Sequence, residues 1–269
     1  MMIRLFFTFI FLLLNFETQP CIELQFRYIG NMGILISGES SSVLIDGMHT
    51  EYNKDSYLFP PQELVDRLTA NNSKEYAPIK AIMATHNHGD HLDGGQIATF
   101  LKKNTDAIFL GSNQSSQEVL KADKTIQSQI QTIDTRSYTK QTITKDDLSI
   151  TGFYMNHAGG DRRSDIQNVG FIVEINNKKI LHMGDTDWYP DMFNELNLVE
   201  EEIDIAVFPF WMLLAENAQQ NVEKWINPNR IVATHLPPKN FERYTVQLKQ
   251  AFPKILSFTE LESVEFFGE

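Results

Sequence analysis

Residues 86–91 read HNHGDH and place three histidines and one aspartate, all able to bind a metal ion, within one short stretch. In an extended loop His86 and His88 point the same way, and the turn at Gly89 lets Asp90 and His91 swing toward a neighbouring point. Few structural roles need such a cluster. The stretch therefore predicts a loop that serves two adjacent metal ions.

One loop cannot complete two coordination shells, so further ligands must come from distant parts of the chain. Three candidates, His157, Asp185 and His235, each follow directly after an expected strand. At a strand end a sheet stops and a cleft can form. Imidazole and carboxylate ligands together suit zinc best, with manganese, iron or nickel as alternatives.

Apolar runs separated by turn residues predict two β-rich halves, each with helices. Strands are expected within residues 24–46, where three short ones form a meander, and at 79–85, 108–110, 148–155, 169–175, 180–183, 203–208 and 231–234. Helices are expected from Pro60 to Asn71 and at residues 96–103, 113–121, 218–226 and 244–252. This pattern favours two sheets packed face to face with helices outside.

The N-terminal residues predict an export signal. Arg4 precedes an apolar run at residues 5–14 that contains one polar residue, Thr8. The run is about half of the roughly 20 residues that a membrane span needs, so a permanent span is disfavoured. We expect a signal peptide at residues 1–21 and one folded domain at 22–269, in a periplasmic or secreted protein. A lipoprotein signal with a lipid anchor on Cys21, the only cysteine, is the alternative.

The net charge of −12, with no basic stripe, argues against nucleic-acid binding and favours a small-molecule substrate. Arg162 and Arg163 could hold an anion over the metal ions, because guanidinium groups match carboxylate or phosphate oxygens; a solvated loop is the alternative. Trp211 could form the wall of an apolar pocket or belong to the core. His49 is expected to be a solvated loop residue, and His182 a structural one.

The HNHGDH motif, followed in order by His157, Gly184-Asp185-Thr186 and His235, resembles the metallo-β-lactamase superfamily over nearly the whole chain after Leu24. The resemblance implies an α/β fold, the four-layer αβ/βα sandwich. It implies one metal ion bound by His86, His88 and His157, a second bound by Asp90, His91 and His235, and Asp185 bridging the two. It also implies that Asp46, after the apolar residues 43–45, orients the metal loop from behind the ligands.

The run YIGNMG at residues 28–33 resembles the branch of that superfamily that includes ascorbate-lactone hydrolases and phospholipase D-like members. Zinc β-lactamases with a cysteine ligand would need a thiol near position 185, where this chain has Asp185. Antibiotic hydrolysis is thereby disfavoured, although it stays an alternative.

Two neighbouring divalent cations lower the pKa of a water molecule between them and produce a hydroxide at neutral pH. We expect this hydroxide to attack a lactone, ester, amide or phosphodiester, and Asp90 to act as a catalytic residue that orients it or carries its proton. Two alternatives are an iron-dependent oxidoreductase with the same ligand types and a metal-stabilised binding protein without turnover.

Overall fold

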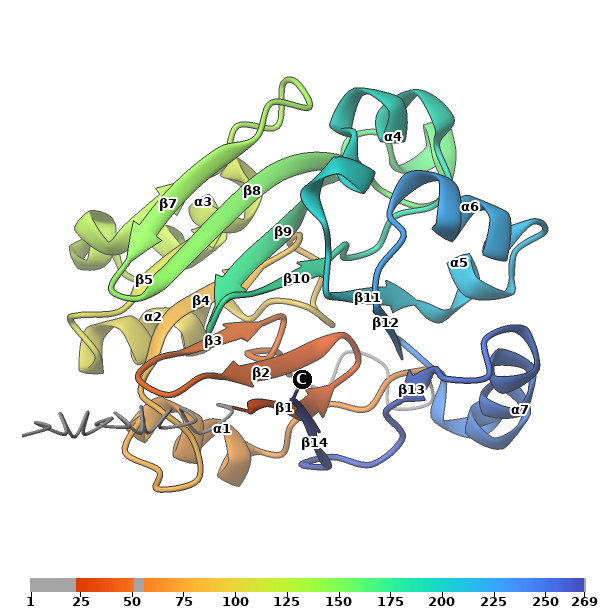
Figure 1. The fold of residues 1–269 in the computed structure, drawn as a ribbon. Helices are drawn as coiled ribbons and strands as arrows, with labels where there is room; N and C mark the ends of the chain where they lie inside the picture. Colours follow the sequence, from red (N-terminus) through yellow and green to blue (C-terminus); the bar gives the residue numbers. More distant parts are fainter. Residues whose placement is uncertain (1–22, 51–55, 269) are drawn as a thin grey trace, which may run out of the picture.

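The structure, a computed structural model, describes residues 23–50 and 56–268 (Figure 1). The expected signal peptide and Cys21 lie outside these residues. Within them, no helix combines the length and the apolar character that crossing a membrane requires.

The first half of the chain and its last strand form a seven-stranded sheet in the order β14-β1-β2-β3-β4-β5-β6. Its strands are β1 (Leu24–Gly30), β2 (Gly33–Ser37), β3 (Ser42–Ile45), β4 (Ile79–Ala84), β5 (Ile108–Gly111), β6 (Ile130–Thr132) and β14 (Val264–Phe267). Pairing is antiparallel from β14 to β3 and parallel from β3 to β6.

The second half forms another seven-stranded sheet, in the order β13-β12-β11-β10-β9-β8-β7. Its strands are β7 (Gln141–Lys145), β8 (Leu148–Asn156), β9 (Gln167–Ile175), β10 (Lys178–His182), β11 (Ile205–Pro209), β12 (Arg230–Thr234) and β13 (Leu256–Ser257). Strands β10 to β13 pair in parallel, and β7 to β10 pair in antiparallel.

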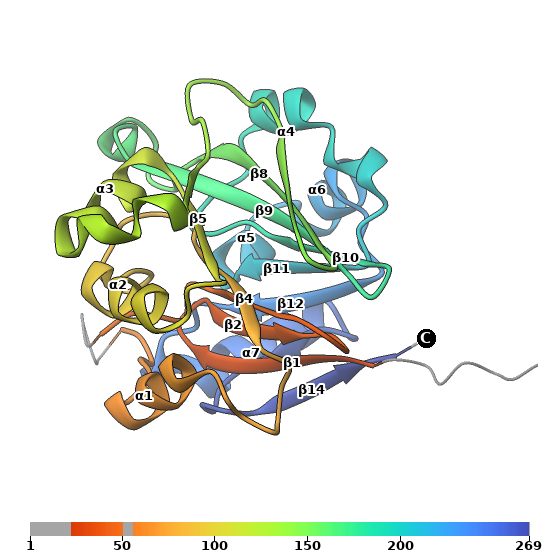
Figure 2. The same cartoon turned by 90° about the vertical axis from the view of Figure 1, so that its left-hand side faces the viewer.

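Helices cover the outer face of each sheet (Figures 1 and 2). The first sheet carries α1 (Gln62–Ala70), α2 (Gly94–Lys103) and α3 (Asn113–Ala122), and the second carries α4 (Pro190–Leu196), α5 (Phe210–Leu214), α6 (Ala218–Trp225) and α7 (Phe241–Ala251). Four short 3-10 helices lie between them: η1 (Lys124–Gln129), η2 (Gly160–Arg163), η3 (Leu198–Glu201) and η4 (Pro238–Asn240).

Local sequence explains where the helices near the metal loop begin and end. Helix α1 starts directly after Pro61 and ends at Asn71, whose left-handed backbone closes the last turn. Helix α2 follows the histidine-rich loop, and its N-cap Asp93 accepts a hydrogen bond from the Gln96 amide at 2.9 Å. The loop is therefore held between the end of β4 and a capped helix.

Three apolar layers hold the sandwich together. Phe26 of the first sheet and Phe171 of the second belong to one buried cluster between the sheets. Leu64 and Ile97 pack under the helices of the first sheet, and Trp225 packs under those of the second. Burial on both faces explains the near-continuous apolar runs of the central strands. The predicted four-layer αβ/βα sandwich is confirmed.

Candidate metal centre

The predicted metal ligands lie where strands of both sheets end. Asp46 follows β3, residues 86–91 follow β4, His157 follows β8, and His235 follows β12. Asp185 comes three residues after the end of β10. Because the parallel strands of each sheet end at the same edge, the two sheets present these side chains to one cleft.

His86, His88 and His157 form the first group. The His86 Nε2 and His88 Nδ1 atoms are 2.8 Å apart, and the Nε2 atoms of His86 and His157 are 3.4 Å apart. One ring nitrogen from each residue lies within 4.8 Å of the others. Burial lowers the pKa of His86 well below its ordinary value, so its imidazole is neutral and offers a lone pair.

Asp90, His91 and His235 form the second group, whose ligand atoms also lie within 4.8 Å of one another. Asp90 Oδ2 is 3.6 Å from His91 Nε2 and 3.5 Å from His235 Nε2. The two groups match the two half-sites that the resemblance implies, and their roles as ligands stay a prediction.

Asp185 lies between the groups. Its Oδ1 is 3.4 Å from His91 Nε2, and its Oδ2 is 3.4 Å from His235 Nε2 and 3.9 Å from His157 Nε2. Both Asp185 Oδ1 and His235 Nε2 are buried without a hydrogen-bond partner among the described residues. Buried carboxylate oxygens and ring nitrogens that lie 3.4–3.9 Å apart, too far for good hydrogen bonds, leave ligand atoms available for a cation, so this set fits a pair of metal ions.

The carboxylates and imidazoles of the centre shift one another's pKa values. Burial alone would raise the pKa of Asp90, but His91 and His235 hold it at about 2. Burial alone would lower the pKa of His235, but Asp185 and Asp90 raise this pKa to about 9. Asp185, Asp90 and Asp46 likewise raise the pKa of His91 well above its ordinary value, against the effect of burial. At neutral pH the centre therefore contains ionised carboxylates paired with protonated imidazoles, which a metal ion would deprotonate on binding.

Asp46 lies behind the metal loop, as the resemblance implies. Its carboxylate accepts hydrogen bonds from the Thr85 amide and from the Thr85 hydroxyl, both at 2.7 Å. Its Oδ2 is also 2.8 Å from His91 Nδ1. This contact holds the His91 ring so that Nε2 faces the cleft, which is the usual role of a carboxylate behind a histidine ligand.

Asn31 was missed as a site residue by sequence reasoning. Its side-chain amide donates to both the backbone oxygen and the Oδ2 of Asp90, each at 3.1 Å, and its backbone oxygen accepts from the His235 amide at 3.1 Å. Asn31 adopts a left-handed backbone with φ of 46° in the turn between β1 and β2. The available signal was the turn in YIGNMG, where asparagine favours this conformation.

The two remaining histidines lie near the centre. The expectation that His49 is solvated is wrong: the ring is fully buried, and burial lowers its pKa to about 4. A position in a loop does not reveal what packs over that loop. His182 is also buried, and its Nε2 lies 3.0 Å from the Met32 backbone oxygen, as expected of a structural residue.

A cavity of about 490 Å³ opens over the centre, lined by Tyr57, His157, Arg162, Arg163, Asp185 and Trp211 among others. Trp211 is half-buried; its Nε1 donates to the Thr186 backbone oxygen at 2.9 Å, and its ring meets His235 edge-on with centroids 4.8 Å apart. Trp211 therefore lines this cavity, whose other lining residues are mostly polar, and it also packs against the core cluster of the second sheet.

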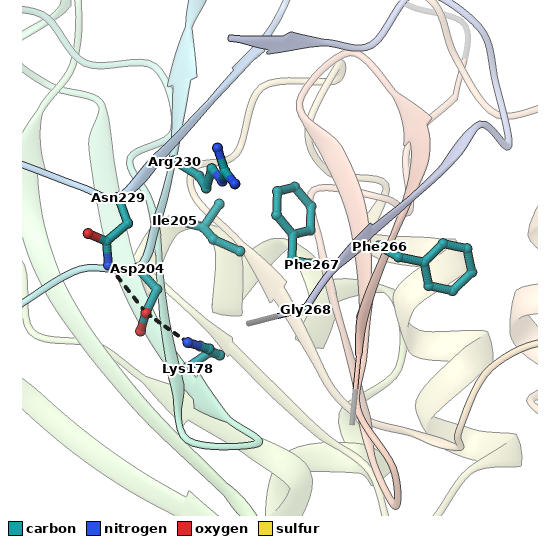
Figure 3. Close-up of a pocket in the computed structure, with 8 residues that line it drawn as sticks. All are labelled: Lys178, Asp204, Ile205, Asn229, Arg230, Phe266, Phe267 and Gly268. Carbon is teal, nitrogen blue, oxygen red and sulfur yellow. Dashed lines mark hydrogen bonds and ion pairs between the residues drawn. The ribbon is translucent and has the colours of Figure 1, made fainter. Parts of the chain in front are cut away.

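A second cavity, of about 420 Å³, lies at the other ends of the strands, where β11 and β12 begin (Figure 3). Figure 3 shows Lys178 and Asn229 directed at Asp204, with Arg230 and Phe267 nearby. The residues that line it include no histidine, so this cavity is separate from the metal centre.

Comparisons with known proteins agree with this geometry. The family model described as a beta-lactamase superfamily domain matches residues 43–252. A metal-dependent hydrolase of Pyrococcus abyssi is 26% identical over 216 residues, which are 78% of this chain and 83% of that protein.

Two solved structures share the fold. An isothiocyanate hydrolase from Delia radicum gut bacteria is 18% identical with a TM-score of 0.59, covering 91% of this chain and 100% of that chain. A diiron β-hydroxylase from Streptomyces venezuelae is 11% identical with a TM-score of 0.57, covering 94% of this chain and 55% of that chain.

Proposed function

Since this chain belongs to the beta-lactamase superfamily, we propose that it is a metal-dependent hydrolase with a dinuclear centre. The observation that carries the proposal is the position of Asp185, within 3.4–3.9 Å of histidines from both groups. Its Oδ2 lies near His157 of the first group and His235 of the second, and its Oδ1 lies near His91, so this carboxylate is suited to join two cations. Zinc is the metal that this nitrogen and oxygen donor set favours, with manganese or iron as alternatives.

In this proposal His86, His88 and His157 hold one ion, Asp90, His91 and His235 hold the other, and Asp185 bridges them. The bound ions supply a Lewis acid and a water of lowered pKa, and so a hydroxide nucleophile for a lactone, ester, amide or phosphodiester. Tyr57 and Trp211 flank His235 with rings 5.0 and 4.8 Å away, and restrict water on that side.

Asp90 is proposed as a catalytic residue. Its Oδ2 accepts from Asn31 and faces His235, and its pKa of about 2 keeps it ionised, so it is able to orient a water molecule as a hydrogen-bond acceptor; carrying a proton would require the pKa to rise during the reaction. Asp90→Asn removes the charge but keeps the shape. We expect turnover to fall about 100-fold or more at full metal occupancy. Unchanged turnover at that occupancy would contradict the role.

The central experiment is a panel of chromogenic lactones, carboxylic esters, β-lactams, phosphomonoesters and phosphodiesters, run with zinc and with manganese. His88→Ala, which removes one donor of the first group, is the matched inactive control. Turnover in the wild type that the variant loses supports the proposal. Metal-loaded wild type that cleaves no class of bond would refute it, and cleavage of β-lactams alone would identify the alternative activity.

An iron-dependent oxidoreductase is the second candidate, favoured by the likeness to the diiron β-hydroxylase and by the same donor types. Metal analysis of protein purified without added metal separates the two. Two zinc ions per chain favour hydrolysis, whereas iron with a visible absorption band favours redox chemistry.

We further propose that the protein is exported to the periplasm or secreted, free or anchored through a lipid on Cys21, and acts on a small molecule and not on nucleic acid. Cell fractionation of the full chain against a Cys21→Ser variant tests this. Equal recovery of both variants in the cytoplasm would contradict export.

A further inference from the structure

Two arginines line the cavity over the metal centre and have no acidic partner within residues 23–50 and 56–268. Arg162 and Arg163 end the 3-10 helix η2 (Gly160–Arg163), where Asp161 separates them from Gly159 and Gly160; the structure shows no ion pair between Asp161 and either arginine. Among the described residues neither guanidinium forms an ion pair, although the chain carries 35 acidic residues. By contrast, Arg136 forms a bidentate pair with Asp134 at 2.6–2.8 Å.

Arg163 packs against the loop that carries His157. Gly159 has a left-handed backbone with φ of 107°, and a Cβ on it would lie 3.1 Å from the Arg163 Cδ. Glycine at this position therefore suits both the backbone conformation and the close approach of the Arg163 side chain. The loop itself is anchored, because the Tyr189 hydroxyl donates to the His157 backbone oxygen at 2.9 Å and accepts from the Gly160 amide at 3.2 Å.

The balance of charge around the cavity indicates which kind of ligand the two arginines would bind. Arg162, Arg163 and His157 line the same cavity, so both guanidinium groups lie close to the first ligand group. Two divalent cations carry more positive charge than the Asp90 and Asp185 carboxylates neutralise, and the other acid lining the cavity is Asp187, which accepts from the Trp188 amide. Two arginine side chains without ion pairs among the described residues, beside a centre that would carry net positive charge with its metal ions, favour a ligand with a negatively charged group.

We propose that the substrate carries an anionic oxygen group, a carboxylate or a phosphate, which Arg162 and Arg163 hold at the mouth of the cavity. This inference rests on the proposed function and names the substrate class for the same centre. A guanidinium pair suits such a group because its planar donors match two oxygens at once.

The first test uses two esters with the same leaving group: neutral 4-nitrophenyl acetate and anionic mono-4-nitrophenyl succinate. In the zinc-loaded Arg162→Ala/Arg163→Ala variant we expect the KM for the succinate ester to rise about 10- to 100-fold, because one or two charge-assisted hydrogen bonds to the substrate are lost. The kcat/KM for the acetate ester should change less than about twofold. Arg136→Ala, which removes one positive charge away from the cavity, should alter the kinetics of neither ester.

Equal losses for both esters, or an equal loss in Arg136→Ala, would overturn the proposal. The double lysine variant adds a second check, because it keeps both charges and loses the planar fork. We expect it to recover part of the affinity for the succinate ester.

The second test measures binding without turnover. Calorimetric titration of zinc-loaded protein with succinate, and separately with inorganic phosphate, should give a Kd about tenfold or more weaker in the double alanine variant at equal zinc content. The stronger of the two probes identifies the anion. An unchanged Kd for both would overturn the proposal. Weaker binding together with no ester turnover would count against the proposed function and not against the anion site.

Discussion

Replacing Asn31 tests whether this residue positions the second ligand group. Asn31→Gly removes the side-chain amide but keeps a residue that tolerates the left-handed backbone with φ of 46°. The lost contacts are hydrogen bonds at 3.1 Å to the Asp90 carboxylate and backbone oxygen, and a contact of 3.4 Å to His91 Nε2, all buried. The backbone contact from the His235 amide to the Asn31 oxygen is kept.

The expected loss of metal affinity in Asn31→Gly follows from these contacts. A buried hydrogen bond to a charged group contributes about 1.5–3 kcal/mol, and removing a partner behind a metal ligand typically costs 10- to 100-fold in metal affinity. We therefore expect the ion held by Asp90, His91 and His235 to bind roughly 10- to 100-fold more weakly in Asn31→Gly. The ion held by His86, His88 and His157 should bind with unchanged affinity, because Asn31 touches none of these residues.

Competition between the protein and a chromophoric chelator resolves the two zinc affinities. Cobalt substitution adds a spectroscopic reading, since a displaced Asp90 changes the absorption of one ion only. Asn217→Gly is the matched control: Asn217 also has a left-handed backbone, with φ of 59°, but it is exposed and caps α6 without a side-chain hydrogen bond. Two unchanged zinc affinities in Asn31→Gly, or the same loss in Asn217→Gly, would refute the reasoning.

Two further predictions concern the loops of the centre. Metal binding at neutral pH should release about two protons per chain, because the pKa of His235 is about 9 and that of His91 lies well above its ordinary value, so metal affinity should rise with pH. Calorimetry in buffers of different ionisation enthalpy measures this, and a zinc affinity independent of pH would contradict it. Gly184→Ala should lower the free energy of unfolding by roughly 2–4 kcal/mol, because Gly184 has φ of 60° and an added Cβ would lie 2.6 Å from the Thr85 Cβ. Denaturant titration at fixed metal content checks it, and a variant as stable as the wild type would show that the loop adapts.

Much of the fold could be predicted because its signals are local. Pro60, Pro61 and Asn71 delimit α1, and the apolar run before His86 marks β4, whichever other segments pack against them. The edge strands gave no such signal. β7 alternates between half-buried and exposed positions, and β14 has only four residues and depends on pairing with β1, which lies over 200 positions away in the chain. Their existence is a consequence of tertiary pairing.

The candidate site divides in the same way. The candidate metal ligands could be named from the sequence because they come at or shortly after the ends of predicted strands. The role of Asn31 and the burial of His49 could not be predicted. Asn31 meets Asp90 across 59 positions of sequence, and an asparagine in a tight turn normally has a purely local explanation. The arginines were found in the sequence, but their missing acidic partners became visible only in three dimensions.

The backbone around the centre explains how strand residues come to face the cleft. Asn31, Asp46 and His235 all have left-handed backbones, with φ between 46° and 61°, each at the point where a strand ends. A residue in that conformation costs about 1 kcal/mol or more and turns the chain out of the sheet, so its side chain leaves the alternating faces of the strand. Hydrogen bonds hold these residues in place. The Thr85 amide donates to the Asp46 carboxylate, and the His235 amide donates to the Asn31 backbone oxygen. Because the carboxylates and protonated histidines already attract one another, the centre has its shape without a metal ion, and in the proposed function metal binding would exchange protons for metal without reordering the chain.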